Sequence, residues 1–411
     1  VALAIGLALG AIVELVVVRR LFDAARVTLL VATIGVAQLL QALVVALPNV
    51  KGVSSAKYPV FLDGRWERAG VSFSGAQVAI VVVVPVCAGA LGWFLNRTRL
   101  GGAVIASADN SRLARTQGIN PKLVSTLVWA IAGVLSTISM VLIASQAGRA
   151  SGIATLGPNT MVRALAAMVI AGMTSFRGSL LAGVAIGIAQ ALIRFNVEAT
   201  GLIDLALFLS VLVAVWVRAR HEDPDTASMS MRSALAPIPE RLRRIWWIRW
   251  LPAAGFAVLL LGAAVLPLVV TTPSRILLYA TVLAFAICAA SVTVLTGWAG
   301  QLSLGQMAFA GLGALSAAAF ARGPLPFALA IPAAAVGTAL LAAVIGVGAL
   351  RVNGLLLAVV TFAFGTAATQ YLYRRPLLSD DQQSTVPFRR GTLFGLDLTP
   401  QRTYYYVLLM V

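Results

Sequence analysis

Long apolar runs dominate this sequence and recur from one end of the chain to the other. Each run approaches the roughly 20 residues that an α-helix needs to cross the hydrocarbon core of a bilayer. Because a bilayer offers the backbone no hydrogen-bonding partners, such runs are expected to form helices. We therefore predict an all-α polytopic membrane protein with about 12–13 transmembrane or re-entrant helices. The runs fall at residues 1–18, 28–47, 76–95, 123–145, 160–175, 179–195, 202–217, 250–270, 276–294, 297–320, 327–349, 353–372 and from 403 onward.

The amino-acid composition excludes a soluble globule. Hydrophobic residues make up 60% of the 411 positions and charged residues only 11%, and the mean hydropathy is +0.94. The net charge of +17 does not indicate a nucleic-acid partner, because the basic residues fall between apolar runs and not on a soluble basic domain. Arginines in loops that face anionic lipid and orient the helices explain this charge better. We expect the lipid bilayer as a partner and no nucleic acid.

A polar stretch interrupts the apolar runs at residues 218–249. Its first part is acidic and contains proline, and it leads into a basic, tryptophan-rich segment at residues 241–250. That composition is typical of a domain boundary followed by a cytoplasmic interfacial anchor. We predict three parts: a first half at residues 1–217, a cytoplasmic linker at 218–249 and a second half at 250–411.

A faint internal similarity relates the two halves. Residues 29–35 with Gln41 resemble residues 357–363 with Gln370, and each segment follows an arginine-bearing loop and leads into a polar loop. Two related halves joined by a linker are the plan of a transporter built around a central pathway. Because the chain opens directly in an apolar run and closes in one too short to span, we expect the first half to be truncated at its N-terminal end and the second at its C-terminal end.

The basic end of the linker also predicts the orientation. Placing the linker in the cytoplasm puts residues 96–122 inside as well, and residues 48–75 and 373–402 outside. The balance of Lys and Arg between the two sides supports this topology only weakly. The outer loops carry charges of both signs, which would suit the docking of a soluble protein but also an ordinary solvated loop.

One apolar stretch, residues 295–314, carries glycines and polar side chains that an ordinary spanning helix does not need. Lipid offers no partners for Gln301, Ser303 and Gln306, so these side chains must face protein or a water-filled path. The glycines permit breaks in the helix and close approach of neighbouring helices. We therefore assign a translocation path to this segment, although a packing face of small residues would show the same pattern. The assigned residues are Gly297, Gly300, Gln301, Ser303, Gly305, Gln306, Gly311 and Gly313.

A second informative segment, residues 96–122, lies between two apolar runs on the predicted cytoplasmic side. It predicts a short polar helix, since Gly118 can take the left-handed conformation that stops a helix and Pro121 prevents its continuation. A cytoplasmic helix held rigidly between two spans can transmit a push to them. The same pattern also fits an ordinary amphipathic loop helix at the membrane surface.

The sequence shows no motif for enzyme chemistry. It contains no Walker A pattern G-x-x-x-x-G-K-[ST], no H-E-x-x-H and no G-x-S-x-G. The only histidine, His221, lies in the linker, which argues against a histidine-based metal site or catalytic triad. Cys87 and Cys288 each lie inside an apolar run and are interpreted as buried small hydrophobic residues. We expect no catalytic residue, no metal and no cofactor in this chain.

Several of these segments resemble the membrane subunits of the branched-chain amino acid ABC importers. Residues 295–314 resemble the glycine-rich early segment of one subunit, residues 106–122 resemble the cytoplasmic coupling segment, and residues 171–183 resemble a glycine-rich segment near the end of the first subunit. Asp204 matches an acidic position that often opens the last helix of that subunit, whereas residues 218–221 depart from the Arg-Pro-x-Gly that commonly follows. The chain is thus similar to two membrane subunits fused head to tail.

The resemblance implies a function and a set of partners. It implies the permease of an importer in the bacterial plasma (inner) membrane that moves amino acids, with branched-chain amino acids as the family expectation. Separate ATPase subunits would bind ATP, and an extracytoplasmic substrate-binding protein would deliver the amino-acid substrate. The coupling segment would contact the ATPase through Asp109, Asn110, Arg112, Ala114, Gly118, Ile119 and Asn120.

Two other functions stay open at the level of the sequence. Related permeases are associated with urea and short amides, and nothing in the glycine-rich segment decides between these substrates. An ion-coupled secondary transporter would need charged residues at membrane depth. The candidates lie near the ends of apolar runs, where snorkelling to the interface accounts for them. They are Glu14, Arg163, Arg194, Glu198 and Asp204.

Overall fold

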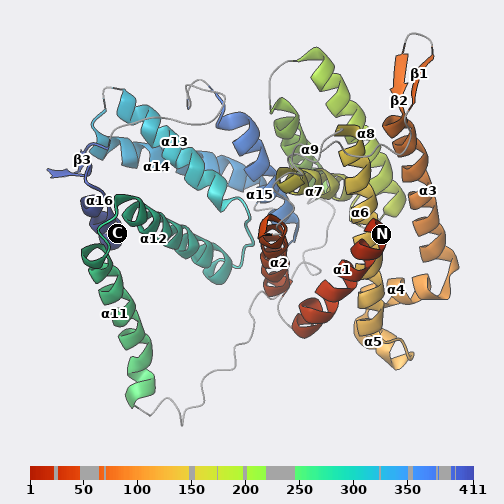
Figure 1. Ribbon diagram of the computed structural model, residues 1–411, viewed down its shortest axis with the longest axis horizontal. Helices are drawn as coiled ribbons and strands as arrows, with labels where there is room; N and C mark the ends of the chain where they lie inside the picture. The colour runs from red at the N-terminus through yellow and green to blue at the C-terminus, as the bar shows by residue number, and fades with distance from the viewer. Residues whose placement is uncertain are drawn as a thin grey trace. The chain divides into compact units, whose positions relative to one another are not determined.

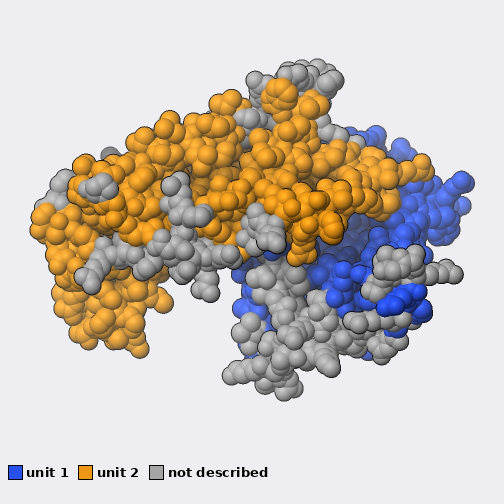
Figure 2. Space-filling view, turned by 90° about the horizontal axis from the view of Figure 1, so that it is seen from above, with its two compact units in different colours: residues 1–160 blue, residues 161–411 orange. Residues whose placement is uncertain are grey.

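The computed structural model shows a chain of α-helices (Figure 1). It describes residues 1–22, 26–46, 64–68, 71–147, 153–173, 175–197, 201–218, 246–323, 325–349, 355–375, 378, 390–393 and 395–411. Within these ranges the β structure is confined to two short antiparallel hairpins. The chain forms two compact units, Val1–Thr160 and Met161–Val411, which Figure 2 colours separately.

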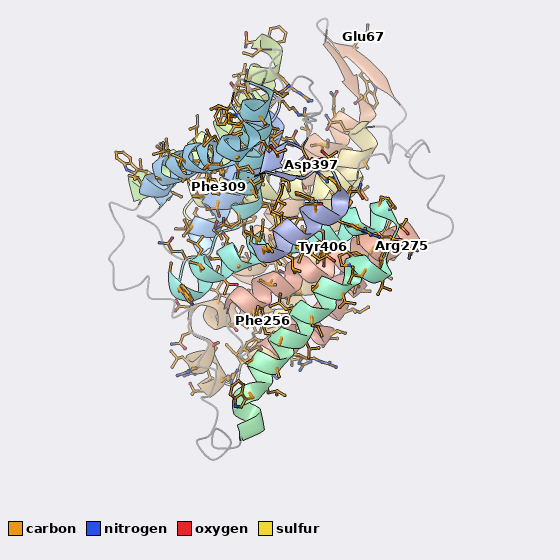
Figure 3. The ribbon with its side chains drawn as sticks, turned by 90° about the vertical axis from the view of Figure 1, so that its left-hand side faces the viewer. Glu67, Phe256, Arg275, Phe309, Asp397 and Tyr406 are labelled. Atoms are coloured by element: carbon orange, nitrogen blue, oxygen red, sulfur yellow. The ribbon has the colours of Figure 1, made fainter. Side chains whose placement is uncertain are left out.

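Helix length and composition establish a membrane protein. Six helices within the described ranges are long and apolar enough to cross a bilayer, and shorter apolar helices accompany them. Many of their large side chains are left uncovered by protein, such as Phe256 on α11 (Trp246–Val269), which is 65% exposed (Figure 3). Apolar surface on this scale is stable against lipid, so the predicted all-α polytopic membrane fold is confirmed. The six spans are Ala2–Leu21, Gly75–Arg97, Pro121–Gln146, Phe176–Asn196, Pro273–Trp298 and Phe327–Val347.

The first unit is built on the pairing of α1 (Ala2–Val16) with α6 (Pro121–Ala147). Glycines let the two backbones touch: a Cβ on Gly10 would strike the Trp129 carbonyl, and a Cβ on Gly133 would strike the carbonyl of Gly6. Small residues are the usual means of such packing, since lipid removes the hydrophobic drive for helices to associate. The other helical elements are a 3₁₀ turn at Val18–Leu21, α2 (Arg26–Ala46), α3 (Gly75–Arg97), α4 (Arg99–Asp109) and α5 (Ser111–Thr116).

A hairpin of β1 (Arg65–Arg68) and β2 (Val71–Ser74) leads directly into α3. Ser74 begins that helix with a reciprocal cap. Its Oγ accepts a hydrogen bond from the Gln77 amide at 3.4 Å, and the Gln77 side chain accepts one from the Ser74 amide at 2.9 Å. Two amides that the helix itself cannot satisfy are thereby paired, which fixes where α3 begins.

The second unit has its core around α15 (Leu355–Ala367), where Val360 is fully buried. Phe364 of this helix stacks on Phe309 of α13 (Gln306–Arg322) with ring centroids 4.7 Å apart. α9 (Leu202–Arg218) packs along the same helix. The last helices of the first sequence half therefore share a core with the second half, and the compact units divide at residue 160 and not at the linker. Also present are α7 (Ile153–Ile170), α8 (Phe176–Asn196), α12 (Pro273–Thr293), α14 (Phe327–Ala349) and α16 (Gln401–Met410).

Two tyrosines fasten the last helix of the described chain. The hydroxyl of Tyr405 donates to the Ala263 carbonyl of α11 at 2.8 Å. The hydroxyl of Tyr406, which Figure 3 labels, donates to the Ala264 carbonyl at 3.2 Å. Tyr405 also packs against Ile276 of α12. Buried tyrosines need such acceptors, so α16 is held in one register against two helices.

The order of elements repeats between the halves. In the first half α2 leads to a hairpin and then to α3. In the second, α15 with its π-helical end at Ala368–Leu372 leads to a hairpin of β3 (Thr392–Leu393) and β4 (Leu396–Asp397) and then to α16. This helix–hairpin–helix order supports the faint sequence repeat. Most of the predicted linker, and most of the loops between each helix and its hairpin, lie outside the described residues.

Candidate functional site

The glycine-rich segment is the place where a spanning helix breaks. α12 ends at Thr293, a π-helical turn follows at Val294–Trp298, and α13 begins only at Gln306. Gly300 has a φ of +66°, which an L side chain rarely adopts. The amide of Gln301 closes the break by donating to the Leu295 carbonyl at 3.0 Å.

One buried threonine anchors the irregular backbone. The Leu304 amide donates to Oγ1 of Thr361 on α15 at 2.9 Å, and that hydroxyl lies 3.0 Å from the Leu357 carbonyl as its own acceptor. The next residue, Gly305, packs onto the same threonine so closely that an added Cβ would lie 2.8 Å from the Thr361 carbonyl oxygen. The contact between the broken helix and α15 therefore requires glycine at 305.

A second glycine permits a close contact further along α13. The Tyr373 hydroxyl donates to the Ala308 carbonyl at 2.9 Å and occupies the space that a side chain at Gly311 would take. These two contacts hold α13 onto α15 and its π-helical end. The glycines at 305 and 311 thus serve close packing, one of the two interpretations that the sequence left open.

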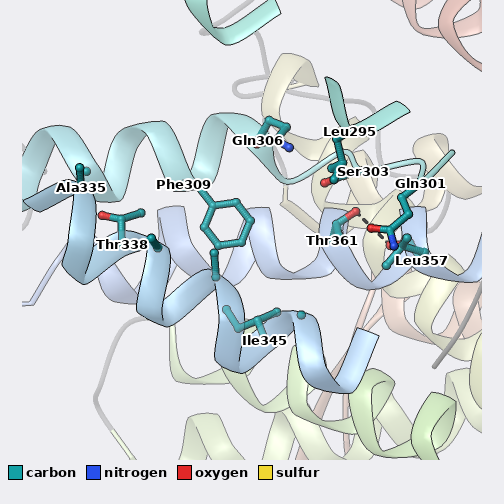
Figure 4. A pocket seen from close by; sticks show the side chains of 14 residues that line it. Leu295, Gln301, Ser303, Gln306, Phe309, Ala335, Thr338, Ile345, Leu357 and Thr361 are labelled. Carbon is teal, nitrogen blue, oxygen red and sulfur yellow. Dashed lines mark hydrogen bonds between the residues drawn. The ribbon is translucent and has the colours of Figure 1, made fainter. Parts of the chain in front are cut away.

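A cavity of about 450 Å³ lies beside the break, between α13, α14 and α15 (Figure 4). Hydrogen-bonding groups from Gln301, Ser303 and Thr361 gather near the break, and the rings and alkyl groups of Phe309 and Ile345 line it farther along α13 and α14. Every lining residue within the described part of the chain is uncharged. The full lining is Leu295, Gln301, Ser303, Gln306, Phe309, Gly313, Ala335, Thr338, Ala339, Ala342, Ile345, Gly346, Leu357 and Thr361.

The path residues assigned from the sequence divide into three groups. Gln301, Ser303, Gln306 and Gly313 line the cavity, and Gly300, Gly305 and Gly311 shape the backbone around it. Gly297 does neither, because it is exposed and meets only a side chain of its own helix. Thr338 and Thr361 also line the cavity, although they were not assigned from the sequence. The feature that could have identified them is a hydroxyl group inside an otherwise apolar run. Thr338 Oγ1 is buried without a hydrogen-bonding partner.

The predicted coupling segment is two short helices, at the lower end of α3 and α6 in Figure 1. Thr98 caps α4 by accepting from the Gly101 amide at 3.0 Å. Asn110 ends α4 and caps α5, accepting from the amides of Arg112 at 3.1 Å and Leu113 at 3.0 Å. The segment therefore consists of two separately capped helices, where the sequence predicted a single short helix.

A tight turn joins this segment to α6. Gly118 has a φ of +82°, and the Ile119 amide reaches back to the Ala114 carbonyl at 3.0 Å, which is the Schellman ending of a helix. Asn120 then accepts from the Lys122 amide at 3.1 Å, capping α6. The end of α5 and the start of α6 are therefore both fixed by local hydrogen bonds around Gly118 and Asn120.

The seven predicted coupling residues serve two roles in this geometry. Asn110, Ala114, Gly118, Ile119 and Asn120 build the caps, the buried contact and the turn. Asp109 and Arg112 are exposed and remain available for an external partner. A groove of about 290 Å³ lies at the turn, lined by Arg115, Gly118, Ile119, Asn120, Pro121 and Lys122.

The structure corrects one interpretation of the charged residues. Snorkelling was expected for Glu14, yet its side chain is 0% exposed, and it accepts a hydrogen bond from the Thr126 hydroxyl at 2.6 Å. Asp204 lies within electrostatic range of Arg163 and Arg374. Within the described residues, no three His, Cys, Asp or Glu side chains come close enough together to hold a metal ion.

A broken apolar helix beside a cavity lined by uncharged residues is typical of membrane transport components. A sequence model of the family described as "Branched-chain amino acid transport system / permease component" matches residues 1–216 and 272–411. The chain belongs to this family and carries two matches to it, as two fused permeases would. No solved structure matches the chain.

Curated relatives agree with this family. The chain is 30% identical over 187 residues to the high-affinity branched-chain amino acid transport system permease protein BraD of Pseudomonas aeruginosa, covering 45% of this chain and 60% of BraD. It is 27% identical over 223 residues to LivH of Escherichia coli K12, covering 52% of this chain and 70% of LivH. A probable LivH of Methanocaldococcus jannaschii is 25% identical over 194 residues, covering 46% of this chain and 60% of the relative.

Proposed function

We propose that this chain is the permease of an importer that moves branched-chain amino acids across the bacterial plasma membrane, driven by ATP hydrolysis on separate subunits. The chain itself has no Walker A pattern, so ATP would be bound by the partner. An extracytoplasmic binding protein would deliver the substrate. Family membership and the names of the relatives support this proposal.

The observation that carries the proposal is the cavity beside the helix break. Its neutral polar groups suit the ammonium and carboxylate of a zwitterion, whose charges cancel overall, and the wall around Phe309 and Ile345 suits an aliphatic side chain. A discontinuous helix at membrane depth is a common way to build such a site. In this proposal Gln301, Ser303 and Thr361 contact the passing substrate, and no residue performs covalent chemistry.

The coupling segment supplies the second requirement of an ATP-driven permease. In the segment of α4 and α5 each helix start is capped, and a short capped turn joins α5 to α6. A displacement of the segment would therefore be passed on to α6. Asp109 and Arg112 would make polar contacts with the ATPase.

One experiment distinguishes the proposed function from two alternatives, an ion-coupled transporter and a permease for urea or short amides. The natural full-length protein is reconstituted in proteoliposomes with its ATPase and binding protein, and uptake of labelled leucine is measured with and without internal ATP. We expect uptake that requires ATP and survives an ionophore that collapses ion gradients. Uptake abolished by the ionophore and independent of ATP would reject the proposal in favour of the ion-coupled transporter that buried Glu14 would suit. ATP-dependent uptake of urea or acetamide without leucine uptake would reject the assigned substrate class.

A further inference from the structure

Glu14 is the only charged side chain that the structure buries completely, among the residues it describes. It lies in the last turn of α1, where α1 packs on α6. The rest of that interface relies on glycines such as Gly6 and Gly10. A carboxylate here loses its hydration, and an apolar residue would fill the place at lower cost. The position therefore calls for an explanation other than simple stability.

The carboxylate makes one directed contact. Oε2 accepts a hydrogen bond from the Thr126 hydroxyl of α6 at 2.6 Å. The other oxygen, Oε1, is buried without a hydrogen-bonding partner. An ion pair or a fully satisfied network would stabilise the helix pair more, so this half-satisfied group gains little for the fold.

What the contact does provide is register. The glycine contacts between α1 and α6 are close: backbone meets backbone at Gly10 and Gly133, and the Thr137 side chain lies against Gly6. These are van der Waals contacts, which hold the two helices together without a directed bond between them. A short hydrogen bond between Glu14 and Thr126 is directional, so it locks the two helices at one relative position.

The contact also lies next to the coupling groove. Thr126 is four residues beyond Lys122, so the two share one face of α6, and the Thr126 hydroxyl lies 3.0 Å from the Lys122 carbonyl. Lys122 in turn lines the groove at the Schellman turn, together with Arg115. A continuous set of contacts thus runs from the groove through the first turns of α6 to Glu14 on α1.

We propose that the Glu14–Thr126 hydrogen bond is the positioning contact that makes α1 move together with α6 when the coupling segment is displaced. The proposal rests on the proposed function, since it assumes an ATPase that pushes on α4 and α5. Neither residue touches substrate. Their role is to convert movement of α6 into movement of the helix pair, so their loss separates ATP hydrolysis from transport.

The test measures substrate imported per ATP hydrolysed by the natural full-length protein, reconstituted with its ATPase and binding protein. Thr126→Val removes the donor. Glu14→Met combined with Thr126→Val removes both polar groups, so neither is left buried without its partner and the main cost to folding is avoided. We expect each to lower the import per ATP by about fivefold or more, with ATP hydrolysis within about twofold of the wild type.

Conservative variants and a matched control separate positioning from stability. Thr126→Ser keeps the hydroxyl and Glu14→Gln keeps an acceptor oxygen, so both should retain the wild-type ratio. The control is Thr137→Val, on the same helix. The Thr137 side chain lies against Gly6 of α1, but its hydroxyl donates within α6 to the Gly133 carbonyl at 2.8 Å. It should also retain the wild-type ratio.

The outcomes distinguish the two proposals. A wild-type ratio in the double variant overturns the positioning role. A parallel fall of import and hydrolysis in proportion to the amount of folded protein shows a merely structural contact and also overturns it. If the double variant does not insert, a Thr126→Ser variant that fails to restore the ratio lost in Thr126→Val overturns it. A wild-type protein without ATP-dependent import rejects the proposed function instead.

Discussion

The amide of Leu304 donates a hydrogen bond to Oγ1 of Thr361 at 2.9 Å, across 57 residues of sequence. This bond ties the non-helical stretch after Gly300 to α15, where Thr361 is only 7% exposed. Irregular backbone at membrane depth persists only where protein or water satisfies its polar groups. Thr361 therefore fixes the position of the broken helix, and the cavity forms beside it.

Replacing this threonine should destabilise the break. Thr361→Val keeps the shape of the side chain but leaves the Leu304 amide without its acceptor, a loss of about 1–3 kcal/mol. We expect a lower unfolding temperature in detergent and ATP-driven import reduced by about fivefold or more. The control is Thr366→Val on the same helix, whose hydroxyl bonds the Ala363 carbonyl at 2.9 Å. Equal behaviour of the two variants would contradict the anchoring role.

Adding one methyl group at Gly305 should have a comparable effect. In Gly305→Ala the new Cβ would lie 2.8 Å from the Thr361 carbonyl oxygen, so α13 or α15 must shift. Overpacking of this kind costs about 1–3 kcal/mol. Gly337→Ala on α14 is the matched control, because its Cβ would meet nothing within 4 Å. The unfolding temperature and the rate of leucine import are measured for both variants. Wild-type import by Gly305→Ala would show that the close contact between residue 305 and Thr361 is not needed for transport.

The coupling segment should crosslink to the ATPase. Single cysteines at Asp109 and Arg112, introduced into a background without Cys87 and Cys288, place thiols on the exposed side of α4 and α5. We expect efficient disulfide or bifunctional crosslinks that change in yield when ATP is bound. Ala90→Cys, exposed in the middle of α3, should give none because lipid surrounds it. Crosslinks from position 90 but not from 109 or 112 would reject this docking surface.

The predicted topology can be tested at two exposed positions. Glu67 on β1 and Gln117 at the end of α5 are both exposed, and the sequence places them on opposite sides of the membrane (Figure 3 for Glu67). A membrane-impermeant maleimide added to intact cells should label Glu67→Cys and spare Gln117→Cys until the cells are lysed. Labelling of Gln117→Cys in intact cells would invert the assigned orientation.

The sequence by itself determined the class of this protein. Runs of about 20 apolar residues favour helices in a bilayer, so the all-α membrane fold was predictable from the sequence. The caps of the coupling segment were also local: Asn110, Gly118 and Asn120 act on amides within a few positions of themselves. The glycine-rich stretch predicted a break for the same reason, since Gly300 alone can take its backbone conformation at little cost.

Only the tertiary structure decided which residues meet across helices. Thr361 and Tyr373 gain their roles from partners 57 and 65 positions away, and Glu14 gains its role from Thr126, 112 positions away. Sequence reasoning interpreted Glu14 as a snorkelling residue because its place near the end of a run was visible, whereas the helix that covers it was not. Lipid-facing and protein-facing sides of a membrane helix are both apolar, so hydrophobic periodicity carries little information about packing partners. The contacts depend instead on which helices approach each other closely at glycines, and the sequence of one helix does not specify its neighbour.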